Sequence, residues 1–372
     1  MTSLKILHVS KKYPKALGGD AVVVSNLQKH QEAAGHQVAI LTSNCPEISN
    51  GAHLYKFGLA DTPAALDSIT PKRLVSLAAL FFKAFVVLGK ERPDVIHTHS
   101  VDMAFFVSFA ARFFKIPLVH TFHIVTFYDR AQPPLRRKSE LLLAKAAGLK
   151  AATAPNDLDV ALLRAAGLHQ AVTLPNGVDA NFWRPAPAPA RGRAFVCISV
   201  GRLEAQKGYE YLIKAAALLK KTSPQPFRVV IVGEGSQKDT LQKLARTLGV
   251  QDKVDFVGAK TPKQVRALLS CADVAVCTSL YETTPLTLLE AWAVGVPVIT
   301  TPVGILQTVP RDTDLVYLVR PKDQYSLHQA IEACMNDKDL RMKVATAGHQ
   351  EAKKYDWPSI TKTAESLYRS VL

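Results

Sequence analysis

Two carboxylates border the start of a predicted helix in the segment "SLYETTPLTLLEAWAVGVPVIT", residues 279–300. If Thr284 is the N-cap and Pro285 takes the first helical position, the missing proline N–H costs nothing. Glu282 then stands on the preceding loop, and Glu290 lies about one and a half turns inside the helix. The free N–H groups and positive dipole end of a helix favour a phosphate. The segment therefore predicts an anion site between two carboxylates, although each carboxylate alone could simply be solvated.

Two loops add candidate contacts to an anion. In "SVGRLEAQKG", Arg202 directly follows a predicted strand and Lys207 comes five residues later. Arginine offers a planar fork to phosphate oxygens and lysine a mobile point charge, so the pair suits a diphosphate. In "KKYPKALGGD", Gly18 and Gly19 let the backbone approach a ligand closely. In isolation, the two cations could face water and the glycine pair could be an ordinary turn.

Four histidines lie at the ends of two other predicted strands: His97, His99, His120 and His123. They lack the i,i+4 helical spacing and the nearby thiols of familiar zinc sites, so we expect no metal. A histidine at the carboxyl end of a strand can hydrogen-bond a sugar hydroxyl or transfer a proton, and His123 is placed for this role. We interpret the other three mostly as core or loop residues.

The elements that must position these residues follow an alternating pattern. Short β-branched runs alternate with amphipathic helical stretches, as in parallel sheets covered by helices. The predicted strands are "KILHVS", "QVAILTS", "DVIHTHS", "PLVHTFH", "KAATAP", "AVTLPNG", "AFVCISVG", "RVVIVGEG", "VDFVG", "DVAVCTS" and "PVITT". Parallel sheets bind ligands at the carboxyl ends of their strands, where the candidate residues lie.

The chain is expected to form two Rossmann-like domains. The stretch "RPAPAPARGR" (184–193) has three prolines and many small residues, which indicates a linker. The first domain then spans 1–183 and the second 194–356. The last stretch, 357–372, is helical in pattern and could pack back on the first domain.

Composition limits the class of protein. The 372 residues are 48% apolar and 21% charged, which describes a folded globular protein. The net charge of +15 favours anionic partners without choosing among nucleotides, acidic lipids and nucleic acid. Five scattered cysteines without CxxC spacing favour a reducing cytosol. We expect no signal peptide, because "MTSLKILHVS" enters a strand-like run at once.

One basic apolar segment suggests a membrane surface. "PKRLVSLAALFFKAFVVLGKER" (71–92) has cations at both ends, and "DMAFFVSFAARFFK" (102–115) has the same character. The apolar run is shorter than the ~20 residues of a membrane span, so we expect a soluble or peripheral protein. A helix face could meet an anionic bilayer near lipid-linked glycans. The alternative is that the aromatic side chains pack against the first sheet; these are Phe105, Phe106, Phe113 and Phe114.

Taken in order, the motifs resemble those of the retaining GT-B glycosyltransferases of family 4, relatives of bacterial mannosyltransferases, lipopolysaccharide glucosyltransferases and sucrose-phosphate synthases. The resemblance covers nearly the whole chain. It rests on the Gly18-Gly19 loop, "PNGVD", "GRLEAQKG", "VGEG", "CADVAVCTSLYE" and the Glu282/Glu290 pair. It implies an α/β GT-B fold whose two parallel sheets face each other across a cleft, with an acceptor-binding first domain and a nucleotide-sugar-binding second domain.

The resemblance assigns roles position by position. The residues implied to bind the donor diphosphate are Gly18, Gly19, Arg202, Lys207, Thr284, Pro285 and Leu286. Glu290 is implied to accept hydrogen bonds from the ribose hydroxyls, and Gly258 falls in the region that frames the nucleobase. Glu282 is implied to lie beside the donor sugar and His123 near the reacting sugar. Thr283 departs from the family pattern, because many members have a glycine there.

The implied activity is that of a hexosyltransferase in polysaccharide biosynthesis. A sugar moves from a UDP- or GDP-linked donor to a hydroxyl of a glycan or lipid-linked acceptor, with retention. Because the sequence offers no obvious protein nucleophile, we expect a front-face route in which the leaving phosphate helps take the acceptor proton. Neither metal nor another cofactor is then needed, and "DTD" (312–314) and "DLD" (157–159) are interpreted as loop and capping residues. The expected location is cytoplasmic, with or without attachment to the inner face of the cell membrane.

Two other functions remain open. A sugar-nucleotide epimerase could bind a similar donor, but it would need carboxylate and histidine groups for proton abstraction. Release of free nucleotide diphosphate together with a new glycoside separates the two activities. A nucleic-acid binder could exploit the positive charge, but the cations are spread along both halves without a stripe interleaved with aromatics, so we expect no nucleic-acid partner.

Overall fold

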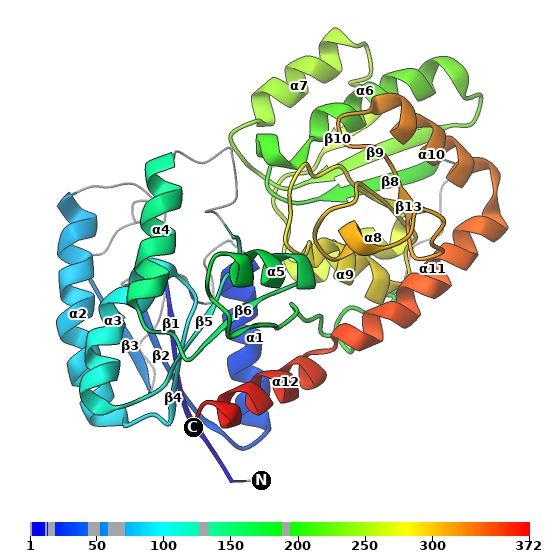
Figure 1. Cartoon of the computed structure of the whole chain (residues 1–372). Helices are drawn as coiled ribbons and strands as arrows, with labels where there is room; N and C mark the ends of the chain where they lie inside the picture. The colour runs from blue at the N-terminus through cyan, green and yellow to red at the C-terminus, as the bar shows by residue number, and fades with distance from the viewer. Residues whose placement is uncertain are drawn as a thin grey trace. The chain divides into compact units, whose positions relative to one another are not determined.

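The chain folds into two compact α/β units (Figure 1). The computed structural model describes residues 2–11, 13, 19–43, 53–58, 71–125, 134–187 and 194–372. The first unit consists of Met1–Asn176 with Trp357–Leu372, and the second of Gly177–Asp356. The second unit begins before the expected linker because Val178 forms a bridge with Asp356 and Trp183 packs into that unit's core. Residues 188–193 of the expected linker lie outside the described part.

The first unit is built on a seven-stranded parallel sheet in the order β3-β2-β1-β4-β5-β6-β7. Its strands are β1 (Lys5–Ser10), β2 (Gln37–Ser43), β3 (Leu54–Phe57), β4 (Val95–Thr98), β5 (Leu118–Thr121), β6 (Ala151–Ala154) and β7 (Ala171–Thr173). Its helices are α1 (Gly19–Ala33), α2 (Pro71–Glu91), α3 (Val101–Phe114), α4 (Pro134–Ala146), α5 (Asp157–Ala165) and α12 (Trp357–Ser370).

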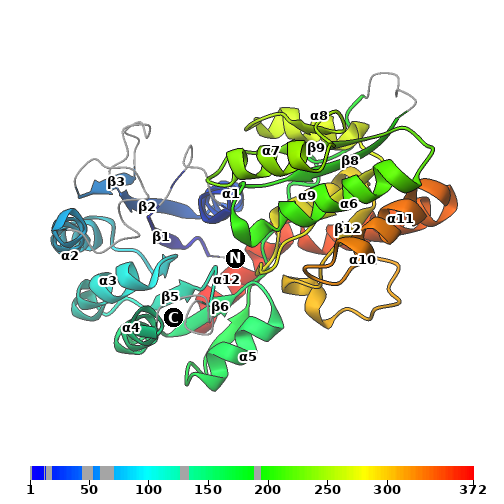
Figure 2. The same cartoon turned by 90° about the horizontal axis from the view of Figure 1, so that it is seen from above.

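Helices cover both faces of this sheet. Successive strand residues point to opposite faces, so Leu7 belongs to a core shared with α2, α3, α4 and α5, whereas Ile6 belongs to a core shared with α1 and α12. Figure 2 shows the helix α12 on the side of the sheet away from α2 and α3. Trp357 and Tyr368 of α12 are almost completely buried there. The C-terminal helix is therefore part of the first unit's core.

The second unit holds a six-stranded parallel sheet in the order β10-β9-β8-β11-β12-β13. Its strands are β8 (Phe195–Val200), β9 (Phe227–Val232), β10 (Val254–Phe256), β11 (Val274–Cys277), β12 (Val298–Thr300) and β13 (Tyr317–Leu318). Its helices are α6 (Tyr209–Thr222), α7 (Lys238–Thr247), α8 (Pro262–Cys271), α9 (Leu286–Val294), α10 (Gln324–Asn336) and α11 (Lys338–Ala352), with short 3-10 helices η3 (Ala205–Lys207), η4 (Gly304–Thr308) and η5 (Lys353–Tyr355). Cys197 belongs to a core shared with α6, α7 and α10, and its neighbour Ile198 belongs to a core shared with α8, α9 and α11.

The predicted strands all appear, each within the run that predicted it or one residue outside it. Two further strands were not predicted, β3 and the two-residue β13, and both lie at a sheet edge. None of the helices in the described ranges has both the length and the apolarity needed to cross a bilayer.

Candidate active site

The order of the second sheet creates a topological switch point between β8 and β11. From β8 the chain proceeds outward through β9 to β10, and from β11 it proceeds the other way through β12 to β13. The loops after β8 and β11 therefore leave adjacent strands in diverging directions, which is where open α/β sheets bind ligands. The first loop carries Arg202 and Lys207, and the second carries Glu282.

Three hydrogen bonds to backbone carbonyls hold these two loops together. The Leu280 N–H donates to the Gln206 carbonyl at 2.8 Å. The Thr278 hydroxyl donates to the Lys207 carbonyl at 2.8 Å, and the Gln206 side-chain amide donates to the Tyr281 carbonyl at 3.2 Å. The loops thus form one framework rather than two independent turns.

Lys207 and Glu282 form an ion pair within this framework. Their side chains are only 17% and 14% exposed, so the pair is largely shielded from water. Glu282 also accepts a hydrogen bond from the Ser279 hydroxyl at 3.2 Å. The sequence predicted that both residues belong to one site, and the structure brings them into contact. It did not predict Ser279, although a polar side chain at the end of the predicted strand "DVAVCTS" was an available signal.

The start of α9 lies just beyond Glu282. Pro285 occupies the N-cap position and Leu286 begins the helix, so the expectation of a Thr284 N-cap is wrong by one residue. The Thr284 hydroxyl is buried and donates to the Thr283 carbonyl at 2.8 Å. Because proline has no side-chain acceptor, no side chain caps the helix. The first-turn N–H groups therefore remain suited to an anion.

Thr283 fits the loop without backbone strain. Among the described residues other than glycine, positive φ occurs at His53, Arg92, Lys115 and Lys322, but not at Thr283. The loop after β12 passes close by, because a Cβ on Gly304 would lie 2.2 Å from the Thr283 carbonyl oxygen.

Glu290 lies on α9, one turn inside the helix, and is partly buried. Burial raises the pKa of its carboxyl group to about 7. At neutral pH the side chain can therefore exist in both protonation states, and a ligand with hydroxyl groups would favour the ionised one. The helix ends at Gly295, which has a φ of 79°.

The other predicted donor residues lie on neighbouring loops. Arg202 is exposed directly after β8. Gly258 follows β10, separated from β8 by β9, and its carbonyl accepts from the Gly233 N–H at 3.0 Å. Gly19 begins α1 in the first unit, and Gly18 lies outside the described residues.

The first unit has its own switch point, between β1 and β4. Lys11, which follows β1, forms a salt bridge of 3.1 Å with the largely buried Asp102 of α3. His123 follows β5 and is partly buried, and its Nε2 lies 3.1 Å from Nδ1 of His99. Burial lowers the pKa of His123, opposed by the charge of Asp20.

Two of the remaining histidines are hydrogen-bonded core residues, as predicted. His97 contacts the Tyr368 hydroxyl at 2.7 Å and the Thr121 hydroxyl at 2.6 Å, while His120 contacts the Thr98 hydroxyl at 2.8 Å. His8, for which no role was predicted from the sequence, lies directly opposite His97 in the register of β1 and β4. A histidine near the end of the first predicted strand was the available signal.

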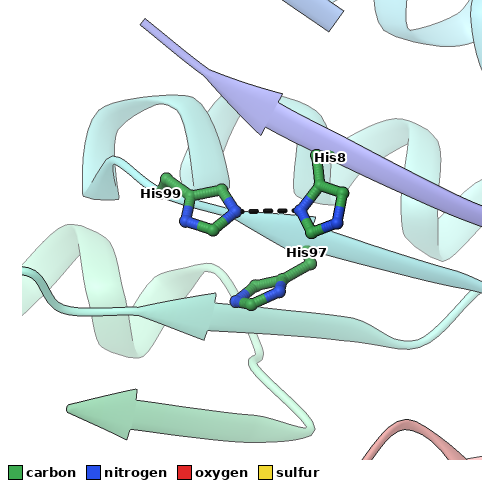
Figure 3. A group of neighbouring side chains, drawn as sticks. All are labelled: His8, His97 and His99. Carbon is green, nitrogen blue, oxygen red and sulfur yellow. Dashed lines mark hydrogen bonds between the residues drawn. The ribbon is translucent and has the colours of Figure 1, made fainter. Parts of the chain in front are cut away.

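His8, His97 and His99 form a cluster that could in principle hold a metal ion (Figure 3). Each offers one ring nitrogen, and these atoms lie within 4.8 Å of one another. However, His8 Nδ1 lies 3.0 Å from His99 Nε2, and both nitrogens of His97 contact hydroxyl groups. Because these contacts match donors with acceptors, the arrangement favours hydrogen bonding over metal ligation.

"DLD" also has a structural role. Asp157 and Asp159 lie in the first turn of α5, whose N-cap Asn156 accepts from the Asp159 N–H at 2.9 Å. Those residues serve the helix start, as predicted.

Known structures with the same architecture identify the class. Sucrose-phosphate synthase from Thermosynechococcus elongatus superposes with a TM-score of 0.82 at 24% identity, covering 99% of both chains. Anabaena HepE in complex with UDP-glucose gives a TM-score of 0.77 at 19% identity, covering 98% of this chain and 99% of that one. The two parallel α/β units therefore define a GT-B glycosyltransferase fold.

Sequence comparisons identify the family. Residues 17–182 match "Glycosyltransferase Family 4", and residues 184–351 match "Glycosyl transferases group 1". The glycogen synthase of Mycobacterium tuberculosis is 28% identical over 405 aligned positions, covering 98% of this chain and 94% of that protein. The D-inositol 3-phosphate glycosyltransferase of Corynebacterium aurimucosum is 29% identical over 304, covering 75% and 72%. The chain belongs to glycosyltransferase family 4 and is a glycosyltransferase.

Proposed function

We propose that the protein is a retaining hexosyltransferase. It transfers a sugar from a UDP- or GDP-linked donor to a hydroxyl of a glycan or lipid-linked acceptor in polysaccharide biosynthesis. The observation that carries this proposal is the Lys207–Glu282 ion pair, which lies at the switch point of the second sheet just before the start of α9. Anabaena HepE, of the same fold, was solved in complex with UDP-glucose, which supports a UDP-linked donor.

In this proposal the donor diphosphate occupies the switch point of the second unit. Lys207 donates to its oxygens, Arg202 adds a second cation, and the uncapped N-terminus of α9 adds N–H groups. The backbone N–H groups of Gly18 and Gly19 are proposed to bind the diphosphate as well. Glu290 accepts from the ribose hydroxyls, and Gly258 frames the nucleobase.

Glu282 is proposed to lie beside the sugar of the donor, and His123 is proposed to act near the reacting sugar. Glu282 is already bound to Lys207 and Ser279, so its carboxylate is held in place for a sugar hydroxyl. Catalysis follows a front-face route without metal, in which the departing phosphate takes the acceptor proton. Lys207, Arg202 and the helix N-terminus stabilise the charge that develops on that phosphate.

A donor panel tests the assignment. UDP-, GDP- and ADP-sugars are incubated with and without candidate acceptors, in buffer containing EDTA. We expect nucleoside diphosphate and new glycoside in equal amounts, with the donor's anomeric configuration in the product and no loss of rate in EDTA. Glu282→Ala is expected to lower kcat by about 10²-fold or more while changing nucleotide binding little. An inverted product contradicts retention, and unchanged kinetics in Glu282→Ala contradicts the site.

We also propose that the protein is cytoplasmic and binds an anionic membrane surface through α2 and α3. These two helices pack against each other, and each carries an exposed apolar stripe. Val75, Phe82 and Val86 are exposed on α2, and Phe109 and Phe113 on α3, with Phe82 69% and Phe113 71% exposed. Phe106 and Phe114, by contrast, pack against the core of the first unit, so only some of the aromatic residues are available to a partner.

Basic residues accompany these stripes, including Lys90 on α2 and Arg112 on α3, both exposed. Large exposed apolar side chains with neighbouring cations suit an anionic lipid surface. We expect the protein to co-sediment with anionic vesicles at low salt, and Phe82→Ser combined with Phe113→Ser to abolish this. Met342→Ser, which removes a 59% exposed side chain of the second unit, is the control. Failure of the wild-type protein to co-sediment contradicts this proposal and leaves the catalytic one unaffected.

A further inference from the structure

A chain of hydrogen bonds joins Gln31 to His123 through two buried histidines. Gln31 Oε1 lies 2.8 Å from His8 Nε2, and His8 Nδ1 lies 3.0 Å from His99 Nε2. His99 Nδ1 in turn lies 3.1 Å from His123 Nε2. Figure 3 shows the central link, between the rings of His8 and His99. Gln31 and His8 are completely buried, so water does not compete for these contacts.

All the hydrogen bonds from Gln31 to His123 are donated in the same direction. The amide oxygen of Gln31 can only accept, so Nε2 of His8 carries its proton and Nδ1 does not. A neutral imidazole has one donor and one acceptor, and therefore His99 donates from Nε2 and accepts at Nδ1. His123 then donates from Nε2, which leaves its Nδ1 unprotonated.

The rings must be neutral for this reasoning to hold. Burial lowers the pKa of His8 to about 4 and lowers the pKa of His99 well below its usual value. A second proton on either ring would also place two N–H groups against each other. Both effects keep the chain in its neutral form at physiological pH.

A second contact orients the Gln31 amide. Its nitrogen donates to the Tyr368 hydroxyl of α12 at 3.2 Å. That hydroxyl can then donate to Nδ1 of His97, 2.7 Å away. With its nitrogen toward Tyr368 and its oxygen toward His8, the amide sets the direction of the histidine chain.

We propose that Gln31, His8 and His99 are positioning residues that hold His123 in its Nε2–H tautomer. Nδ1 of His123 then accepts a hydrogen bond from a hydroxyl group of the sugar. This inference rests on the proposed role of His123 at the sugar. It specifies that Nδ1 is the atom of His123 that contacts the sugar. This row of hydrogen bonds does not carry protons away from the site. It ends at the amide oxygen of Gln31, which does not take up a proton at physiological pH.

Nitrogen-15 NMR of the full-length protein, labelled at histidine and free of donor, reads the tautomer directly. The spectrum of His123→Gln assigns the His123 signals. In the wild-type protein we expect unprotonated Nδ1 and protonated Nε2. Gln31→Met removes the terminal acceptor with little change in volume, so both tautomers of His123 should become populated. Thr98→Val removes a buried hydroxyl that contacts His120 outside the chain, and should leave the tautomer of His123 as in the wild type.

Kinetics provide the second measurement. Gln31→Met should lower kcat by about two- to tenfold, the effect of losing one neutral hydrogen bond, without changing the KM for the nucleotide sugar. A proton on Nδ1 of His123 in the wild type, or an unchanged tautomer in Gln31→Met, overturns the proposal. So does a metal ion that co-purifies in equal amount and shifts the signals of His8, His97 and His99. Because the spectra are recorded without donor, they decide the tautomer even if the proposed transfer reaction is not found.

Discussion

At position 207, an ammonium group lies beside a carboxylate in a site with little access to water. Replacing Lys207 by alanine removes a charged donor to the proposed diphosphate and leaves Glu282 without its partner. Hydrogen bonds to charged groups contribute about 1.5–3 kcal/mol, so the Kd for UDP or GDP should rise by about 10- to 150-fold. Isothermal titration calorimetry measures this change.

The matched control is Lys220→Ala. Lys220 also forms a lysine–carboxylate pair, with Asp252, but on the exposed surface of α6. Its removal should leave the Kd unchanged. An equal loss of affinity in both variants would mean that net charge, rather than the site, determines nucleotide binding.

The raised pKa of Glu290 predicts that the affinity for nucleotide depends on pH. Burial raises the pKa of its carboxyl group to about 7, so the unliganded protein loses this proton only near neutrality. An ionised carboxylate accepts hydrogen bonds from hydroxyl groups without first releasing a proton. Nucleotide affinity should therefore increase as pH rises through about 7 and level off above it. In Glu290→Gln the increase should disappear; calorimetry at several pH values tests this, and a persistent increase would assign it to another group.

The same shift has a consequence for stability. The folded state binds the Glu290 proton more tightly than the unfolded state, whose pKa is near the ordinary value of 4.5. The contribution of this residue to the free energy of unfolding therefore falls as pH rises from about 4.5 to about 7.

Residue chemistry was partly predictable from sequence. Lys207 and Glu282 could be assigned to one site because each follows a strand, and the carboxyl ends of parallel strands lie at one edge. Gln31 could not, because a glutamine in the middle of a helix carries no sequence signal for its role. Its proposed role depends on a hydrogen bond to Tyr368, a residue more than 300 positions away in the sequence.

Among the elements, the loop between β8 and α6 needs a glycine at position 208. Gly208 has φ of 63°, and a Cβ there would lie 2.4 Å from the Thr278 carbonyl oxygen. Gly208→Ala should therefore lower the free energy of unfolding by about 1–3 kcal/mol, displace Lys207 and weaken nucleotide binding. Urea denaturation and calorimetry measure the two effects.

Gly249→Ala is the control for Gly208→Ala. Gly249 has a similar φ of 67°, but a Cβ there would meet nothing within 4 Å. This variant should show only the conformational cost, about 1 kcal/mol, with normal nucleotide binding. Equal nucleotide affinity in the two variants would contradict the role of the loop in positioning Lys207.

Sequence periodicity predicted the buried strands well because parallel strands are apolar on both faces. It did not predict β3, because a lysine interrupts the apolar residues of "LYKF", or β13, which has only two residues. The cap of α9 was placed one residue early because threonine is normally a better N-cap than proline. Here the Thr284 hydroxyl is buried against the Thr283 carbonyl instead.

At the scale of the whole molecule, we expect α12 to stabilise the first unit and not the second. Trp357 is 1% exposed and packs among residues of β1, β2 and α1. Trp357→Ala should cost the first unit about 3–5 kcal/mol. In hydrogen exchange, β1, β2 and α1 should then exchange faster while β8, β9 and α6 remain as protected as before. Uniformly faster exchange in both units would contradict their separate cores.

The return of α12 to the first unit also fixes an order of events during synthesis. The ribosome makes residues 1–176 first, but their core lacks Trp357 and Tyr368 until the end of the second unit has been translated. The second unit, Gly177–Asp356, is complete in sequence before that moment. The first unit can therefore complete its core only after the second unit has been translated, and until then its unfinished sheet face is what chaperones would meet on the nascent chain.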